Sequence, residues 1–244
     1  MTWWEMLLLA AGGALAGIIN TVAGGGSMLT VPLLVLAGVP GNSANGSNRL
    51  GILTSTASAT MSFRRLGVDG LSRSVPVLVP TLVGSFVGSM TISRLPDRTF
   101  EIVFGVLMIP LIVMTVRKPK AREGVEPWAM WVTVLVFGLI GIFGGAFQAG
   151  IGLVLLAALT RAGFDLVMAN SIKVVVSLTV TVVALPVFLL SGKIVWLPAI
   201  VLAIGFMVGG WLGAHVAVRG GEKLIRTAMV LASIALSGRL IGLY

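Results

Sequence analysis

Five polar side chains inside apolar stretches of this sequence could bind an anion. Asn45 and Asn170 stand near the start of two apolar segments, and Asn48 and Lys173 follow three residues later. An asparagine amide offers two N–H donors, which suit an oxyanion. A lysine inside an apolar segment is costly unless it is paired, and this segment holds no acidic residue, so a bound anion is the expected partner of Lys173. The alternative for Lys173, and for Arg49, is that the side chain extends to the edge of the apolar layer.

Glycines break the first apolar stretch at T-V-A-G-G-G-S, residues 21–27. In lipid a broken helix exposes N–H and C=O groups, so a break survives only where protein or a polar cavity covers it. Glycine adopts positive φ at little cost, which lets the chain reverse and lets a ligand approach the backbone. The helix that resumes near Ser27 points its N–H groups and the positive end of its dipole at the turn, which favours an anion there.

A second break, G-I-F-G-G-A-F-Q-A-G-I-G at 141–152, occupies the matching place in the second half of the chain. Two breaks in corresponding positions point to a transport site near the middle of a membrane. The candidate substrate-binding residues are Asn20, Gly24, Gly25, Gly26, Ser27, Asn45, Asn48, Arg49, Gln148, Asn170 and Lys173. The alternatives are that the glycines only permit close helix packing and that Asn20 and Gln148 cap the broken helix ends.

The composition places these residues in a membrane protein. Of 244 residues, 57% are hydrophobic and only 10% are charged, and the mean hydropathy is +1.07. Apolar runs alternate with short polar loops throughout, which predicts an all-α polytopic membrane protein rather than a soluble domain. The net charge of +9 comes from basic residues in loops, where they set orientation, so we expect no nucleic-acid partner. The short loops favour a bacterial-type inner membrane.

The sequence repeats itself without a gap when it is shifted by 125 residues. Gly38 falls on Gly163, and the pair Ala44–Asn45 falls on Ala169–Asn170. We therefore predict a first repeat at 1–116, a charged linker at 117–127 and a second repeat at 128–244. Each repeat has one interrupted segment (3–38 and 128–163) followed by three simple ones of about the length that spans a bilayer. The simple segments are expected at 43–64, 74–93, 99–116, 168–190, 195–217 and 223–243.

The basic residues favour a re-entrant hairpin for each interrupted segment. If that segment crossed the membrane, the loop Lys and Arg residues would divide 9 against 6 between the two sides. If it turns back, they divide 11 against 4, which fits the positive-inside rule better. Each repeat then crosses three times, so the two homologous repeats must be inverted, with both termini outside. This is the architecture of many secondary transporters.

The first half carries a family resemblance. The stretch GIINTVAGGGS (17–27), followed by VPLLVLAGVPGNSANGSNRLGILTSTASATMSFRR (31–65), resembles the TauE/SafE sulfite exporter family. The glycine-rich break, the Val-Pro stretch ending in Gly-x-Pro and the basic end of the next helix carry the likeness, and two homologous halves also fit. The resemblance implies an exporter or permease of a small anion such as sulfite, a sulfonate, another organosulfur compound or a carboxylate.

Other chemistry is poorly represented. The sequence has no cysteine and one histidine, His215, which could shuttle a proton but is more often a packing residue. All eight carboxylates fall in loops or near segment ends, so carboxylate-based cation coupling is disfavoured, although backbone carbonyls at the breaks could still hold Na⁺. Thr54, Ser55 and Thr56 could line a path or help helices pack. We expect no enzyme activity, no metal and no cofactor.

The sequence therefore predicts a secondary transporter that exports a small anion by uniport or weakly coupled transport. An anion channel with a fixed pore would use the same residues and is the main alternative. A structural or assembly subunit would explain the packing glycines but not Lys173 with the paired asparagines. The expected partners are the anionic substrate and the lipid bilayer, and small-xxx-small faces allow a homodimer.

Overall fold

A computed structural model describes residues 3–116 and 128–219, and all regular structure in these ranges is α-helical. The helices are α1 (Trp3–Val22), α2 (Ser27–Leu36), α3 (Gly41–Arg65), α4 (Gly70–Ile92), α5 (Asp97–Val116), α6 (Met130–Phe147), α7 (Ile151–Arg161), α8 (Leu166–Leu190) and α9 (Trp196–Val218). Each predicted segment within these ranges is present, with bounds that differ by a few residues. The predicted linker at 117–127 and the predicted last segment at 223–243 lie outside the described residues.

Within the described ranges, six helices are long and apolar enough to cross a membrane. They are α1, α4, α5, α6, α8 and α9. Many of their large apolar side chains face outward, including Val79 of α4, Leu139 of α6 and Ile204 of α9. Such a broad apolar exterior is stable against lipid rather than water. The chain is a multi-pass membrane protein.

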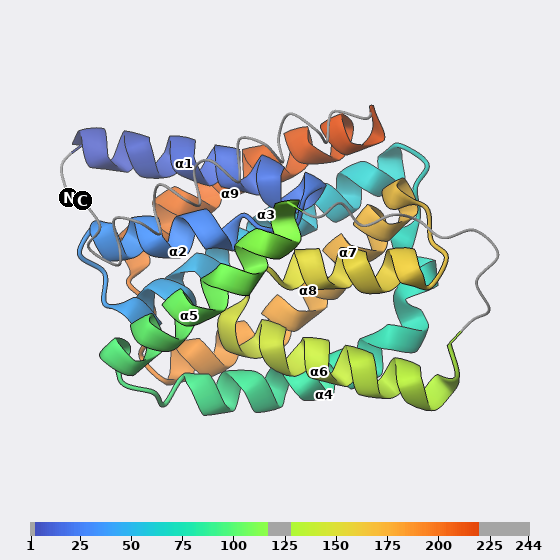
Figure 1. Ribbon diagram of the computed structural model, residues 1–244. Coiled ribbons are helices and arrows are strands. Elements are labelled where there is room, and N and C mark those ends of the chain that lie inside the picture. The colour runs from blue at the N-terminus through green and yellow to red at the C-terminus, as the bar shows by residue number, and fades with distance from the viewer. Residues whose placement is uncertain (1–2, 117–127, 220–244) are drawn as a thin grey trace.

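The sequence predicts a simple membrane-spanning segment at 43–64. Helix α3 occupies this place and is long enough to span a bilayer, but it is too polar to count among the six apolar helices. The polar side chains of its first half, Asn42, Asn45, Asn48 and Arg49, are fully buried. Helix α3 packs against α8 and α9 in the interior of the bundle (Figure 1). Burial against other helices, rather than apolarity, keeps α3 out of the lipid, and most of its buried polar side chains form hydrogen bonds inside the protein.

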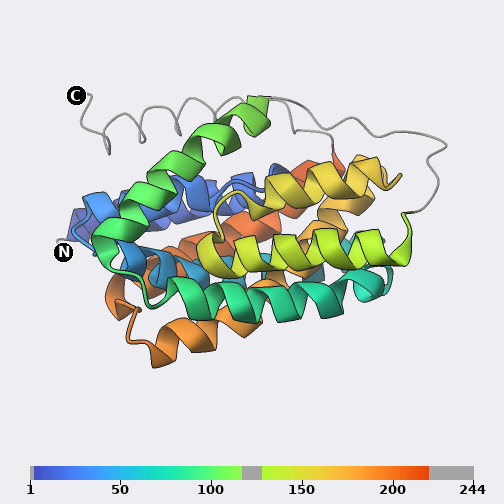
Figure 2. The ribbon, with the colours of Figure 1, turned by 60° about the horizontal axis from the view of Figure 1, so that its bottom comes forward.

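The chain reverses direction at both predicted breaks. Helix α1 ends at Val22 and α2 runs back toward the end of the bundle where α1 began, and α6 and α7 form a second such hairpin that opens to the opposite end (Figure 1). Helices α3 and α8 run through the bundle in opposite directions, as the second view also shows (Figure 2). The loops after α2, α4 and α8 therefore lie at one end, and the loops after α3 and α7 lie at the other.

Glycines bring the outer helices into close contact. A Cβ atom on Gly84 of α4 would lie 2.2 Å from the Gly138 carbonyl oxygen of α6, and one on Gly209 of α9 would lie 2.1 Å from the Ala14 carbonyl oxygen of α1. The motifs Gly84-x-x-x-Gly88 and Gly209-x-x-x-Gly213 therefore permit close helix packing, which is a common role of glycines at this spacing in membrane helices. These two glycine faces pack against other helices of the same chain.

Candidate functional site

The two hairpins meet at their turns. A Cβ atom on Gly24 would lie 2.4 Å from the Gly152 carbonyl carbon, and one on Gly152 would lie 2.3 Å from the Gly24 Cα. The backbones are therefore in direct contact, which only glycine at both positions permits. Gly24 has φ +85° and Gly150 has φ +73°, so glycine also supplies the left-handed conformations that reverse the chain. Gln148 adopts φ +59° in the second turn and is the one non-glycine residue with positive φ in the described part of the chain.

This contact places the N-terminal ends of α2 and α7 beside each other. Helix α2 begins at Ser27 after Gly25 and Gly26, and α7 begins at Ile151 after Gly150. Neither N-cap residue, Gly26 or Gly150, supplies a side-chain hydrogen bond to its helix. The positive ends of two helix dipoles thus adjoin at the turns, although several first-turn N–H groups, such as those of Met28 and Leu153, already donate to main-chain carbonyls.

Lys173 lies at the C-terminal end of α1. Its Nζ atom donates to the carbonyl oxygens of Asn20 at 3.0 Å and Thr21 at 2.6 Å, and to the side-chain oxygen of Asn170 at 2.7 Å. The Lys173 side chain is 1% exposed. These carbonyls belong to the last turn of α1, whose main-chain acceptors have no partner within the helix. The ammonium group satisfies them and neutralises the negative end of the α1 dipole.

Arg49 does the same for α6. Its guanidinium group donates to the carbonyl oxygens of Gly144 at 3.4 Å, Gly145, and Ala146 at 3.1 Å. It also donates to Oε1 of Gln148 at 3.2 Å. The Arg49 side chain is fully buried, and its Cζ atom lies 4.3 Å from the ring centroid of Phe188, which is a cation–π distance.

Each of the two cationic side chains binds a helix in the half of the chain to which it does not belong. Arg49, on α3 of the first half, binds the broken helix α6 of the second half, and Lys173, on α8 of the second half, binds the broken helix α1 of the first. Asn45 of α3 adds to this crossing by donating from Nδ2 to the Ala146 carbonyl oxygen at 2.8 Å. Each broken helix is therefore held by the half that does not contain it.

The remaining candidates line the start of α2 and the second turn. Asn48 donates from Nδ2 to Ser27 Oγ at 2.9 Å and accepts from Thr30 Oγ1. Gln148 donates from Nε2 to Thr181 Oγ1 at 3.1 Å. The predicted residues Asn45, Asn48, Arg49, Gln148, Asn170 and Lys173 thus take part in hydrogen bonds at one or the other of the two breaks.

The geometry changes two of the predicted roles. Lys173 and Arg49 do not reach the edge of the apolar layer, because both are buried and bonded to main-chain carbonyls. The observed oxygens around Lys173 also mean that an anion is not needed to explain its burial. Gln148 accepts a hydrogen bond from Arg49 and donates one to Thr181, so its side chain joins α3 and α8 at the second break.

Sequence reasoning missed several residues of this site. Thr21, Thr30, Thr181 and Phe188 were not among the candidates, because threonine and phenylalanine are ordinary residues of apolar segments. Gly152 lies in the second glycine-rich stretch but was not among the candidates. The only signal for it in the sequence is its place in that stretch, three residues after Ala149, and this signal is weak.

Three buried polar atoms near the breaks have no hydrogen-bond partner among the described residues. They are Thr21 Oγ1, Asn45 Oδ1 and Arg49 Nε. Buried polar groups are normally paired, and exceptions cluster at functional sites. The network around the two breaks therefore retains both donor and acceptor capacity.

Side chains singled out for other chemistry lie outside this network. His215 shares a hydrogen bond with the Trp211 carbonyl oxygen one turn earlier in α9 at 2.9 Å, and its ring packs against that of Trp211, which fits a packing residue. Thr54 Oγ1 donates to the Ala203 carbonyl oxygen of α9 at 2.8 Å and so joins two helices.

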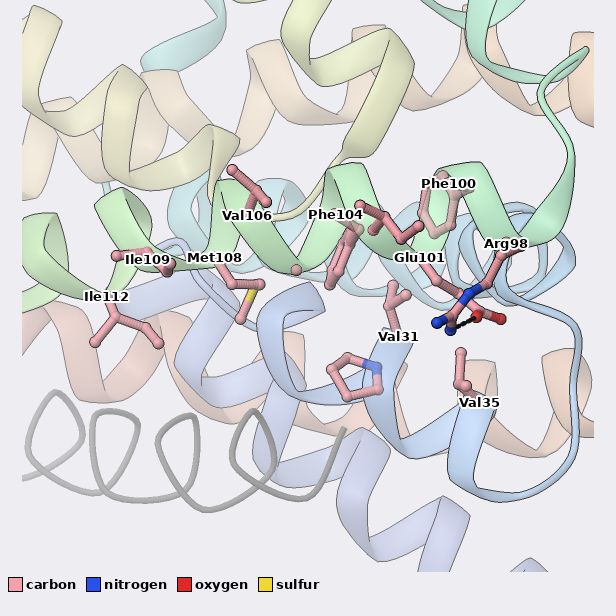
Figure 3. A pocket seen from close by; sticks show the side chains of 13 residues that line it. Val31, Val35, Arg98, Phe100, Glu101, Phe104, Val106, Met108, Ile109 and Ile112 are labelled. Atoms are coloured by element: carbon pink, nitrogen blue, oxygen red, sulfur yellow. Dashed lines mark ion pairs between the residues drawn. The ribbon is translucent and has the colours of Figure 1, made fainter. Parts of the chain in front are cut away.

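A groove on the outside of the bundle is separate from the candidate site. It has a volume of about 470 Å³, lies between α2 and α5, and is lined mainly by apolar side chains such as Val31, Phe104 and Met108 (Figure 3). Arg98 and Glu101 form an ion pair of 3.5 Å at one end of it (Figure 3). None of the predicted site residues lines this groove.

Comparison with known proteins gives consistent results. The family model described as "Sulfite exporter TauE/SafE" matches residues 9–240. The "Probable membrane transporter protein ORF9" of Sinorhizobium sp is 29% identical, and the match covers 93% of this chain and 89% of that protein. "Probable membrane transporter protein YfcA" of Escherichia coli K12 is 29% identical over 93% of this chain and 86% of its own length. A "Probable membrane transporter protein" of Haemophilus influenzae is 28% identical, with 97% and 94% coverage. No solved structure matches.

Proposed function

We propose that this chain, which belongs to the sulfite exporter TauE/SafE family of membrane transporters, exports a small anion through the place where its two broken helices meet. The expected substrate class is sulfite, a sulfonate or another organosulfur or carboxylate anion. The proposal extends to an inner-membrane location and to a binding site near the middle of the bilayer.

One observation carries this proposal: the N-terminal ends of α2 and α7 adjoin through the Gly24–Gly152 contact, while cations hold the C-terminal ends of α1 and α6. The negative ends of α1 and α6 are thus neutralised, and the positive ends of α2 and α7 adjoin at the turns. An anion at this position is favoured by the positive ends of two helix dipoles.

We also propose that the two halves are inverted repeats. Helices α3 (41–65) and α8 (166–190) correspond at the 125-residue shift that relates the sequences. The main packing pairs correspond as well, because α1 packs on α9 and α6 packs on α4. The hydrogen bond from Val195 N to Ser47 Oγ has a counterpart from Gly70 N to Ser171 Oγ. These correspondences support an alternating-access transporter whose site lies at the repeat interface.

The orientation follows from the basic residues. Among the described residues, the end of the bundle that holds the loops after α3 and α7 has the basic residues Arg64, Arg65, Arg73, Arg161 and Arg219, and the other end has Arg94, Arg98 and Lys193. The positive-inside rule favours the first of these ends as the cytoplasmic one. The N-terminus is then outside. An inside-negative potential favours exit of a monoanion by about 2.3 kcal/mol per 100 mV.

Flux through reconstituted vesicles tests the proposal and its alternative, an anion channel. Purified protein is placed in liposomes loaded with a labelled anion, and the rate of release is measured against concentration. An exporter with alternating access saturates, and an unlabelled anion on the far side accelerates exchange. A channel gives no such acceleration, and vesicles that retain every anion of the proposed classes would contradict the transport function.

A further inference from the structure

We propose that Lys173 and Arg49 are built-in substitutes for coupling cations, so that this protein transports without binding Na⁺ or K⁺. In many transporters with broken helices, the exposed carbonyls at half-helix C-terminal ends bind the ion that drives transport. Here both such ends are occupied by cationic side chains of the same chain. The inference rests on the proposed transport function, although its first test does not.

The surroundings of Lys173 resemble a site for a small monovalent cation. Its Nζ atom lies within 3.0 Å of three neutral oxygens, two from the α1 backbone and one from the amide of Asn170. Carbonyl and amide oxygens are the ligands that hard cations prefer. The negative end of the α1 dipole adds to the attraction. An alkali ion at this place would displace, or be displaced by, the ammonium group.

The corresponding place at α6 is filled by a guanidinium group. Arg49 reaches three successive carbonyls, those of Gly144, Gly145 and Ala146, through a planar fork of donors. The Phe188 ring covers the guanidinium group at 4.3 Å. A free cation at the end of α6 would therefore have to compete with a buried group that already bonds several acceptors.

The covalent attachment of both cationic groups to the protein determines which gradients can drive transport. An ammonium or guanidinium group that is covalently part of α8 or α3 neutralises the helix end but cannot be released on the other side of the membrane. The gradient of Na⁺ or K⁺ then contributes nothing, and a transported monoanion carries its own charge across. The sequence left Na⁺ binding at the break carbonyls open; the observed contacts argue against it.

Thermal unfolding of the purified protein tests the substitution without any substrate. Wild type, Lys173→Ala and Lys173→Met are melted at constant chloride with Na⁺, K⁺, methylammonium or the bulky N-methylglucamine ion. The alanine variant opens a space beside the three oxygens, so a small cation that binds only the folded state must raise its melting temperature by several degrees. The methionine variant fills that space without charge and serves as the matched control.

The expected result is a shift for Lys173→Ala with at least one small cation, and none for wild type or Lys173→Met. If no cation shifts the alanine variant, or if Na⁺ or K⁺ stabilises wild type, the substitution is refuted. Wild-type vesicles give a second measurement that does not depend on recovery of the variant. Anion release must stay within a factor of two when N-methylglucamine replaces all Na⁺ and K⁺, and a tenfold loss would overturn the inference. If no anion is transported, the melting result still decides whether Lys173 fills a cation site.

Discussion

Gly24 and Gly152 lie backbone to backbone, although 128 positions separate them, and this contact joins the two reversals of the chain. A Cβ atom on either residue would lie within 2.5 Å of main-chain atoms of the other. Neither backbone can move aside without displacing a helix start. The contact therefore determines how closely the N-terminal ends of α2 and α7 approach.

Gly152→Ala should destabilise the protein and stop anion flux. Its Cβ atom would lie 2.3 Å from the Gly24 Cα, and overpacking of this kind costs typically about 1–3 kcal/mol. Gly105→Ala is the matched control, because Gly105 lies inside α5 with nothing within 4 Å of its added Cβ atom. We expect that control to gain about 0.5–1 kcal/mol from helix propensity. Melting temperatures measure the stability of the two variants, and vesicles measure their anion flux. Equal stability and equal flux of Gly152→Ala and Gly105→Ala would contradict the contact.

A second glycine pair separates crowding from backbone strain. Gly24 and Gly38 have φ of +85° and +86°, but a Cβ atom on Gly38 would meet nothing within 4 Å. Alanine should cost roughly 1–2 kcal/mol at either position for the left-handed conformation. Gly24→Ala should lose more stability than Gly38→Ala and should also lose flux. A Gly38→Ala variant with the larger flux defect would show that the turns are not where function resides.

Removal of Arg49 should be among the most damaging single changes. Arg49→Met removes the side-chain donor of the Gly145 carbonyl, and an unsatisfied buried group costs about 1–3 kcal/mol. The Gly144 and Ala146 carbonyls lose one of two donors, because they also accept from Gln148 N and Asn45 Nδ2. Arg49→Lys should be intermediate, since one ammonium group cannot reproduce the fork. Arg98→Met is the control: Arg98 is exposed and forms a surface ion pair worth about 0–1 kcal/mol. Unfolding measured for the three variants should rank them in this order, and an Arg49→Met protein as stable as Arg98→Met would refute the capping role.

Two asparagines of α3 should separate stability from substrate recognition. Asn42 and Asn45 are both fully buried and both donate from Nδ2 to carbonyl oxygens. Asn42 binds Ile92 and Leu95 at the end of α4, away from the breaks, whereas Asn45 binds Ala146 beside them. Asn42→Ala should lower the melting temperature and leave the KM for anion flux unchanged. Asn45→Ala should raise that KM several-fold. Equal KM values would remove Asn45 from the site.

The locations of the breaks and of the helices could be predicted from the sequence, because glycine runs and apolar lengths are local signals. The residues around the breaks could be predicted as well, since polar side chains in apolar segments are rare and need partners. The partners themselves could not. Lys173 and Arg49 bind main-chain carbonyls, which every residue possesses, so no residue type marks Thr21 or Gly145 as an acceptor. The contact of each cationic side chain with the other half of the chain depends on how the hairpins pack, which no local pattern encodes.

Transport should respond to membrane potential but not to alkali-ion gradients. If a monoanion moves alone, each turnover carries one charge, and 100 mV changes the driving force by about 2.3 kcal/mol. Vesicles clamped at different potentials should therefore accumulate or release the anion according to the sign of the potential. Electroneutral flux would indicate obligatory exchange or a co-transported ion instead.

Anion binding by the purified protein tests the central claim most directly. Melting temperatures are measured for wild type and Asn45→Asp with sulfite, sulfate, thiosulfate, sulfonates and small carboxylates. A ligand that binds only the folded state raises the melting temperature, and a carboxylate at position 45 should repel an anion beside the breaks. We predict that one anion class stabilises wild type and that Asn45→Asp loses this stabilisation. If no anion stabilises wild type, or if both proteins respond alike, the anion site at the two breaks is wrong.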